Sequence, residues 1–296
     1  MAGLPMDQRE GWIWFDGELK PWKDVKVHVL THGLHYASSV FEGERAYGGE
    51  IFKSREHTER LIRSAATLDM PFPYTVEEIE AAKRLVLEKN GLVDAYVRPV
   101  AWRGSEELSV PARNNKVHVA IAAWVWPSYF SVEEKLKGIR LEWSKWKRPS
   151  PETIPSSAKA AGLYMICTLS KDAAMANGYA DALMLDYRGY VAEATGANVF
   201  FIKGKEITTP TPDCFLNGIT RQTLIQLAKE NGYTVTERHI LPEELSNFDE
   251  CFLTGTAAEV TPVSLIGEYS FTPGEGCRTL IDAYTAAVQP KRAAAE

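Results

Sequence analysis

One lysine and one glutamate lie among small residues in the middle of the sequence. Lys159 is in the run SSAKAAGLY, and Glu193 begins the run EATGANVF. A lysine amine can form an imine with a carbonyl cofactor, and a carboxylate can keep a pyridine nitrogen protonated. The pair therefore indicates pyridine-aldehyde chemistry, provided that the chain also offers a phosphate site. The alternative is that Lys159 is a solvated loop lysine and Glu193 a surface charge on a hairpin.

Two later stretches have the composition of a phosphate site. LNGITR, residues 216–221, precedes an amphipathic helix. Its Gly218 allows close backbone approach, and Ile219 and Thr220 supply amide donors at a helix start, where the helix dipole favours an anion. TGTAAE, residues 254–259, follows an apolar strand with two hydroxyls among small residues, which is a second anion nest. Arg60 is a candidate charge partner, although such an arginine commonly lies on a solvated helix face.

Regular elements surround these residues. Apolar residues spaced by three and four predict a helix from about residue 163 that ends at Asn177-Gly178. Strands are predicted at 182–185, around Glu193 and at 199–202. A second amphipathic helix, from about residue 219, is expected to end at Asn231-Gly232.

The N-terminal part predicts strands and two helices. Strands are expected at 11–15, along the alternating Val25, Val27 and Val29, and at 95–102 and 116–126. Ser54 is expected to be the N-cap of a helix over 55–68, and a capping box at Thr75 starts a second helix that ends at Asn90-Gly91. Hairpins with separate helices predict an α+β class, with domains at 1–129 and 141–296 joined by an interdomain loop at 130–140.

Composition excludes several classes of function. The chain has 296 residues, 45% of them hydrophobic, and a formal net charge of −6, which argues against a nucleic-acid partner. Its longest apolar run, 117–126, is shorter than the about 20 residues that span a bilayer, and no secretory signal is evident. The four cysteines have no paired spacing and the six histidines no metal spacing. We therefore expect a cytoplasmic protein with buried thiols, no metal, and no membrane or nucleic-acid partner.

Five motifs in sequence carry a resemblance to a known family: VFEGER at 40–45, SSAKAAGLY at 156–164, EATGANVF at 193–200, LNGITR at 216–221 and TGTAAEVTPV at 254–263. Together they resemble the class IV pyridoxal-phosphate aminotransferases, most closely the branched-chain amino acid aminotransferases, from about Trp12 to Leu265. The resemblance implies fold type IV, with a small N-terminal α/β domain and a larger C-terminal domain with a pseudo-barrel sheet.

The resemblance also implies contacts with pyridoxal 5'-phosphate. Lys159 falls on the lysine that bears the coenzyme and shuttles the α-proton, and Glu193 on the carboxylate that pairs with the pyridinium nitrogen. Tyr164 falls on the tyrosine that contacts the phenolic oxygen. The phosphate-binding positions of the family fall on Arg60, Ile219, Thr220 and Thr256. Leu216 falls on the residue that packs against the ring, and Gly196 on the glycine that lets the sheet backbone approach the coenzyme.

The implied substrates are leucine, isoleucine and valine with 2-oxoglutarate and glutamate, as in branched-chain amino acid biosynthesis. The α-carboxylate is expected near the amides of Thr256 and Ala257 and the hydroxyl of Tyr96, which Arg98 supports. An apolar pocket is implied at Tyr36, Phe41, Gly43 and Tyr129, and Leu108 and Val110 are expected to enter it from a neighbouring subunit of a homodimer or higher oligomer. Arg45 and Arg98 are candidates for the distal carboxylate of glutamate. Glu44 stands where the family usually has an aliphatic residue, and strand alternation predicts that it points away from the face of Gly43.

Other activities of the same fold are alternatives. D-amino acid aminotransferases carry an Arg-x-His trap where this chain has Arg98-Pro99-Val100. An (R)-amine transaminase shares the apolar pocket, but Tyr96 with Arg98 fits an α-carboxylate better. Aminodeoxychorismate lyase would keep the coenzyme residues and change the substrate residues. A catalytically silent binding or structural dimer would have no need for Lys159, Glu193 and the phosphate donors together.

Overall fold

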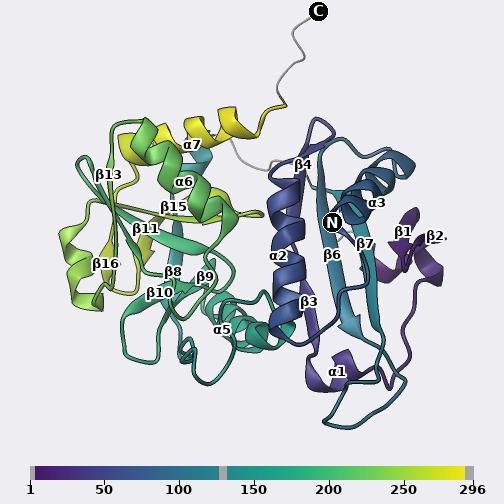
Figure 1. Ribbon diagram of the computed structural model, residues 1–296. Helices are drawn as coiled ribbons and strands as arrows, with labels where there is room; N and C mark the ends of the chain where they lie inside the picture. Colours follow the sequence, from purple (N-terminus) through teal and green to yellow (C-terminus); the bar gives the residue numbers. More distant parts are fainter. Residues whose placement is uncertain (1–3, 127–131, 291–296) are drawn as a thin grey trace, which may run out of the picture. The chain divides into compact units, whose positions relative to one another are not determined.

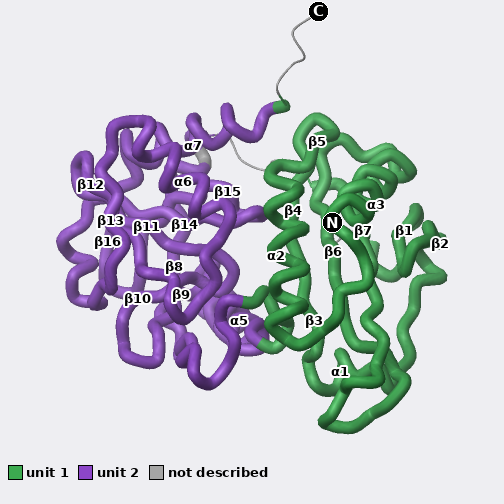
Figure 2. Tube along the Cα trace, in the orientation of Figure 1, with its two compact units in different colours: residues 1–127, 158–162, 290–296 green, residues 128–157, 163–289 purple. Residues whose placement is uncertain are grey.

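The computed structural model describes residues 4–126 and 132–290. The chain divides into two compact units, shown in Figure 2. Unit 1 contains residues 1–127, 158–162 and 290–296, and unit 2 contains residues 128–157 and 163–289. The short segment around Lys159 thus belongs to unit 1. The domain boundaries expected from the sequence, 1–129, 130–140 and 141–296, stay a prediction.

Unit 1 is built on an antiparallel sheet with the strand order β2-β1-β7-β6-β4-β5, in which β3 also pairs with β6 (Figure 1). Its central hairpin joins β6 to β7 through nine residue pairs, from Ala95↔Val125 to Arg103↔Val117. The strands are β1 (Trp12–Phe15), β2 (Glu18–Pro21), β3 (Ser39–Phe41), β4 (Glu44–Tyr47), β5 (Glu50–Ile51), β6 (Ala95–Arg103) and β7 (Val117–Val125).

The helices of unit 1 are α1 (His32–Tyr36), α2 (Ser54–Thr67) and α3 (Val76–Lys89), with short 3-10 helices at Met6–Gln8 and Trp22–Asp24. Helix α3 packs on β1 and β7, and α2 packs on α3 and β3. Helix α3 begins as predicted, because the side chain of Thr75 accepts from the amide of Glu78 and the carboxylate of Glu78 accepts from the amide of Thr75. Both helices turn apolar residues such as Leu61 and Ile79 into the core.

Two local predictions in unit 1 are wrong. Ser54 is the first residue of α2 instead of its N-cap, and Lys53 holds the N-cap position with a left-handed φ of 54°. The segment with Val25, Val27 and Val29 forms no strand. A 3-10 helix at Trp22–Asp24 precedes it, and Val25 and Val27 instead line an apolar cavity.

Unit 2 contains a sheet that closes on itself. Its strands follow the order β10-β9-β8-β15-β14-β11-β12-β13, and an added pairing of β10 with β11 closes six of them into a ring. The closing pair is Glu193↔Asn198. The strands are β8 (Ile139–Trp143), β9 (Asp181–Leu185), β10 (Val191–Ala194), β11 (Asn198–Lys203), β12 (Glu206–Pro210), β13 (Thr234–Arg238), β14 (Glu250–Gly255), β15 (Glu259–Ile266) and β16 (Tyr269–Ser270).

The core of unit 2 fills the closed sheet with apolar side chains such as Leu183, Val199 and Leu253, all at most 2% exposed. The helices are α4 (Val132–Lys135), α5 (Met165–Ala176), α6 (Ile219–Glu230) and α7 (Glu275–Val288), with 3-10 helices at Ala161–Tyr164 and Pro242–Asn247. Helix α5 packs on β9, whereas α6 and α7 pack on each other and on β14 and β15 (Figure 1). Helices α5 and α6 end at Asn177 and Asn231, as predicted.

The long, apolar kind of helix that crosses a membrane does not occur within residues 4–126 and 132–290.

Candidate active site

A buried carboxylate lies where the sheet of unit 2 closes. Glu193 is on β10 and is 6% exposed. Arg148 donates to its Oε1, and Nδ2 of Asn198 donates to its Oε2 at 3.0 Å. Burial is the largest single effect and works to lower the pKa of the Arg148 guanidinium, but Glu193, Cys167 and Tyr164 together raise that pKa by more, so the net shift is upward. Glu193 is therefore held between a permanent cation and an amide donor, and an ionised carboxylate is an acceptor-only group of the kind that suits a protonated ring nitrogen.

The start of α6 lies beside this carboxylate. Gly218 is the N-cap of α6 and supplies no side-chain cap. Its own amide donates to Oδ1 of Asn198 at 3.2 Å. The next amides, those of Ile219 and Thr220, belong to the first turn, where no carbonyl of the helix can accept from them. Such a turn binds phosphate through its amides and the helix dipole.

Two buried polar atoms indicate that this part of unit 2 binds a ligand. Oγ1 of Thr254, on β14, and Nε of Arg148 have no hydrogen-bond partner among the described residues. A buried hydroxyl without a partner is costly in a finished core, so it fits a residue that meets a ligand. Gly196 is exposed, and a Cβ there would meet no atom within 4 Å, so the backbone is open at this edge. The closed end of the sheet thus offers a carboxylate, a helix start and an unpaired hydroxyl.

The other site residues predicted in unit 2 lie in the turns and short segments that flank its helices and strands. Leu216 is half-buried, and its carbonyl accepts from Nδ2 of Asn198 at 3.1 Å. Tyr164 ends the 3-10 helix that precedes α5 and is half-buried. Thr256 and Ala257 form the turn between β14 and β15. Their roles toward phosphate, ring and carboxylate stay predictions.

Lys159 is anchored through its backbone within unit 1. Its amide donates to Oγ of Ser64 on α2 at 3.0 Å, and its carbonyl accepts from the amide of Phe41 at 3.1 Å. Its Nζ lies 4.9 Å from the centre of the Phe41 ring. The flanking Ala158 and Ala160 are buried, which explains why the run around this lysine consists of small residues. The main chain therefore fixes where the amine can reach.

Arg60 is held by Glu42, a partner that the sequence analysis did not find. Its Nε and Nη2 donate to Oε1 and Oε2 of Glu42 at 2.7 and 2.8 Å. Nδ1 of His57 contacts the same carboxylate at 2.7 Å. Burial works to raise the pKa of Glu42, but Arg60 and His57 lower it by more, so the pKa lies well below its usual range. A two-point ion pair thus orients the arginine that the resemblance assigns to the phosphate.

Tyr96 is the centre of the predicted substrate residues in unit 1. Nη2 of Arg98 donates to its hydroxyl at 3.0 Å. A Cβ on Gly43 would collide with that same hydroxyl, so glycine is required for this approach. The guanidinium of Arg98 lies 4.7 Å from the Phe41 ring centre. Unit 1 therefore brings Phe41, Gly43, Tyr96 and Arg98 together with the lysine that contacts Phe41.

The two remaining charges of VFEGER point in opposite directions. Arg45 shares its face of the sheet with Tyr96, its register partner, and its Nη2 donates to the carbonyl of Trp126 at 3.3 Å. Glu44 lies on the other face and pairs with Lys83 of α3 at 2.8 Å. The carboxylate of Glu44 thus points away from Gly43, as strand alternation predicted.

Other predicted substrate residues are exposed in this chain. Tyr36 is 47% exposed, Leu108 43% and Val110 78%. The loop with Leu108 and Val110 is nevertheless fixed, because the buried His32 bonds the carbonyl of Ser109 through Nε2 at 2.9 Å. Tyr129 lies outside the described residues.

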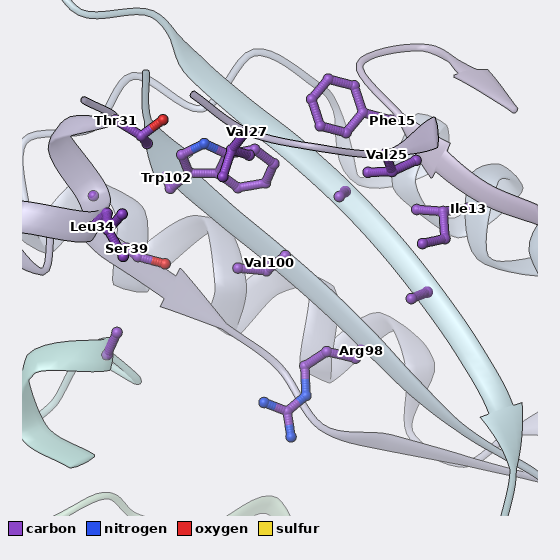
Figure 3. A pocket seen from close by; sticks show the side chains of 14 residues that line it. Ile13, Phe15, Val25, Val27, Thr31, Leu34, Ser39, Arg98, Val100 and Trp102 are labelled. Carbon is purple, nitrogen blue, oxygen red and sulfur yellow. The ribbon is translucent and has the colours of Figure 1, made fainter. Parts of the chain in front are cut away.

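An apolar cavity of about 440 Å3 opens in unit 1. Figure 3 shows Phe15, Val25 and Trp102 among the side chains that line it, with the guanidinium of Arg98 as a charged group in the lining. The lining residues from β1 and β7, such as Ile13 and Ala120, alternate with Trp14 and Ile121, which are buried on the helix side.

One acidic cluster in unit 2 has a cation of its own. Asp186, Asp213 and Cys214 have ligand atoms within 4.8 Å of one another. Nη2 of Arg188 donates to Asp186 at 2.6 Å and to Asp213 at 2.8 Å. The arginine therefore bridges the two carboxylates and offsets one of their two charges.

Arg148, Asn198 and Glu42 are the site residues that the sequence analysis missed. Asn198 and Glu42 stand inside EATGANVF and VFEGER, so their motifs gave a signal for position but none for role. Arg148 stands in the segment KRPSP, 45 residues from its partner Glu193, and no pattern marks it.

A sequence profile described as Amino-transferase class IV matches residues 39–266. The probable branched-chain-amino-acid aminotransferase of Rickettsia felis is 46% identical over 266 residues, 90% of each chain. The branched-chain-amino-acid aminotransferase of Pseudomonas aeruginosa is 44% identical over 264 residues, 88% of this chain and 86% of that one. Among solved structures, a T.th. branched-chain amino acid aminotransferase with pyridoxamine 5'-phosphate aligns with a TM-score of 0.92 and 40% identity, over 95% of both chains.

Proposed function

Because the chain belongs to the class IV aminotransferases, we propose that it transfers the amino group of leucine, isoleucine or valine to 2-oxoglutarate with pyridoxal 5'-phosphate as coenzyme. The observation that carries this proposal is the buried Glu193, held by Arg148 and Asn198 beside the uncapped start of α6. A carboxylate for a pyridine nitrogen and a helix start for a phosphate are the two contacts that this coenzyme needs. The substrate class is the one that the relatives' names carry.

When bound, the coenzyme accepts the electron pair left at the α-carbon of the amino acid. The protein supplies binding and proton transfer. Lys159 would hold the coenzyme covalently and, once the substrate amine has taken its place and released its Nζ as an amine, would move the α-proton within the reach that its anchored main chain permits. Glu193, whose carboxylate Arg148 fixes, would keep the ring nitrogen protonated. The amides of Ile219 and Thr220 would hold the phosphate, with Arg60 and Thr256 as further contacts, and Tyr164 would orient the phenolic oxygen.

The substrate residues of unit 1 fit an amino acid with an apolar side chain. The Tyr96 hydroxyl accepts from Arg98, which leaves its own proton to donate to a carboxylate. The rings of Trp124 and Trp126 lie 5.1 and 5.2 Å from that of Tyr96, and the ring of Phe41 lies against Arg98. An apolar pocket with one polar anchor selects branched aliphatic side chains.

Three amino donors test the substrate class. The protein is assayed with 2-oxoglutarate and L-leucine, D-alanine or (R)-1-phenylethylamine, and only L-leucine is expected to react. Lys159→Ala is expected to lose several orders of magnitude in turnover, whereas Lys203→Ala, at an exposed strand end, keeps wild-type turnover. Consumption of D-alanine or the amine at the rate of L-leucine, or more than about 1% of wild-type turnover in Lys159→Ala, would contradict the proposal.

We propose further that two copies of the chain associate through the face of unit 1 that carries the apolar cavity. Val27 and Leu34, which line the cavity, are 55% and 65% exposed, and Val110, on the loop that His32 holds, is 78% exposed. Large exposed apolar patches mark interaction sites, and the occupant we favour is a second copy, because Leu108 and Val110 are the residues that the resemblance sends into a neighbouring pocket.

Light scattering coupled to size exclusion tests this association. The wild type is expected to elute as a dimer or a higher oligomer, and Val110→Asp to weaken the assembly and lower turnover together. Val93→Asp is the control, because Val93 is also exposed, at 56%, but stands in the loop before β6. A fully active monomer in the wild type would refute the proposal.

We also propose a cytoplasmic location. All four cysteines are free and buried, which fits a reducing compartment. Fractionation of the source cells tests it, and activity in an extracellular or membrane fraction would contradict it.

A further inference from the structure

Asn198 occupies the point where the sheet of unit 2 closes. It is the register partner of Glu193 across β10 and β11 and is 5% exposed. Its Nδ2 donates to Oε2 of Glu193 at 3.0 Å and to the carbonyl of Leu216 at 3.1 Å. Its Oδ1 accepts from the amide of Gly218 at 3.2 Å. One side chain therefore contacts the carboxylate for the ring, the residue for the ring face and the turn for the phosphate.

The amide of Asn198 can adopt only one orientation. Both hydrogens of Nδ2 have acceptors, and Oδ1 has a donor in Gly218. A flipped amide would place its oxygen against the Glu193 carboxylate and its NH2 group against the Gly218 N–H, so both contacts would become repulsive. The side chain is thus locked at both ends, and moving Glu193 relative to α6 would break at least one of its hydrogen bonds.

Gly218 contributes to the same close approach. A Cβ at this position would overlap Oδ1 of Asn198, so only glycine lets the amide of the N-cap reach the asparagine. The N-cap of α6 would ordinarily receive a side-chain cap from its own residue. Here the tie runs from the helix start to a strand instead, which joins α6 to the carboxylate at the sheet closure.

We propose that Asn198 is a positioning residue that fixes the spacing between Glu193 and the first turn of α6, so that the ring nitrogen and the phosphate of one coenzyme molecule are bound together. This inference rests on the proposed function. Binding two ends of a ligand with groups held in advance avoids the entropy of ordering them on binding, so loss of the tie should weaken the affinity for coenzyme.

Two substitutions separate the two ends of the tie. Asn198→Asp keeps the acceptor for the Gly218 amide but replaces the donor to Glu193 by a second carboxylate. Asn198→Leu has nearly the same shape and removes both contacts. Asn231→Asp is the control, because Asn231 caps the other end of α6 at the surface through a bond to Leu227.

The readout is the dissociation constant of the full-length apoprotein for three probes: pyridoxal 5'-phosphate, pyridoxal without phosphate, and inorganic phosphate. In Asn198→Asp, the affinity for pyridoxal is expected to fall about tenfold or more, which corresponds to the loss of one hydrogen bond to a charged group. The affinity for inorganic phosphate is expected to stay within about twofold of wild type. In Asn198→Leu, the affinities for pyridoxal and for inorganic phosphate are both expected to fall, and the affinity for pyridoxal 5'-phosphate is expected to fall most. If Asn198 had a merely structural role, both variants would lose affinity for all three probes equally, and their melting temperatures would fall as well.

The outcomes decide the inference. Wild-type affinity for all probes in both variants overturns it, and so does an equal loss for every probe in Asn198→Asp. If Asn198→Leu does not fold, the isosteric Asn198→Asp still decides through the split between pyridoxal and phosphate. A wild-type protein that does not bind pyridoxal 5'-phosphate would instead remove the proposed function, and the inference with it.

Discussion

Replacing Lys83 by methionine should destabilise the protein more than any other lysine substitution in α3. The ammonium of Lys83 is fully buried and has three oxygen partners. It lies 2.8 Å from Oε2 of Glu44, 2.8 Å from Oε1 of Glu80 and 3.0 Å from the carbonyl of Ser54. It therefore joins α3 to β4 and to the start of α2 in a place that is shielded from solvent.

The magnitude follows from what Lys83→Met leaves behind. The Glu44 carboxyl is fully buried, and burial raises its pKa even with Lys83 present. Removing one partner of a buried pair costs about 3–5 kcal/mol, because the other charge stays uncompensated. At about 2–4 °C per kcal/mol for a chain of this size, the melting temperature should fall by roughly 10 °C. Lys83 works to lower the pKa of Glu44, so without it that pKa rises further, and the loss in the variant should grow as the pH rises above the ordinary pKa of 4.5.

Thermal and urea unfolding at pH 5 and pH 7, followed by circular dichroism, measure this loss. Glu44→Leu combined with Lys83→Met should recover most of the stability, since a buried pair can be replaced by apolar residues at little cost. Lys89→Met is the control in the same helix, because its pair with Glu88 is exposed and 3.9 Å long. A Lys83→Met variant within about 1 kcal/mol of wild type, or a double variant no better than the single one, would refute the reasoning.

Three further substitutions have definite outcomes. Glu193→Gln should keep the fold but lower turnover, because a neutral amide does not hold the ring nitrogen protonated; wild-type turnover would show that another group does so. Gly43→Ala should raise the KM for L-leucine, because its Cβ displaces the Tyr96 hydroxyl; an unchanged KM would remove Tyr96 from carboxylate binding. Glu42→Gln should lower stability at pH 7 and flatten the acid limb of the stability curve. The depressed pKa of Glu42 gives stability that is present above the ordinary pKa of 4.5 and is lost as the pH falls below it, so an unchanged acid limb would contradict the ion pair with Arg60.

The fold class was predictable from the sequence because its signals are local. The capping box at Thr75 and the Asn-Gly pairs after α5 and α6 involve only residues close in the chain. They correctly predicted the start of α3 and the C-terminal ends of α5 and α6. The α+β class predicted from these elements is confirmed, and so is the pseudo-barrel sheet that the family resemblance implied for the C-terminal part. The alternation of Val25, Val27 and Val29 was misleading, because Val25 and Val27 line an apolar cavity and the segment does not pair as a strand.

The partners of the site residues were not predictable, because they depend on tertiary structure. Glu44 meets Lys83, which lies 39 residues further along the chain, and Glu193 meets Arg148 from another element 45 residues away. A motif gives the type and order of residues, whereas a hydrogen bond between strands depends on the register. Asn198 shows the difference, since its motif placed it near Glu193 but gave no sign of its bond to Gly218.

The most direct test of the central claim is the covalent site of the coenzyme. The purified protein with pyridoxal 5'-phosphate is reduced with borohydride, digested and analysed by mass spectrometry. The account predicts the phosphopyridoxyl mass on the peptide that contains Lys159 and its absence from that peptide without reduction. Attachment at a different lysine, or no added mass in a fully loaded protein, would contradict it.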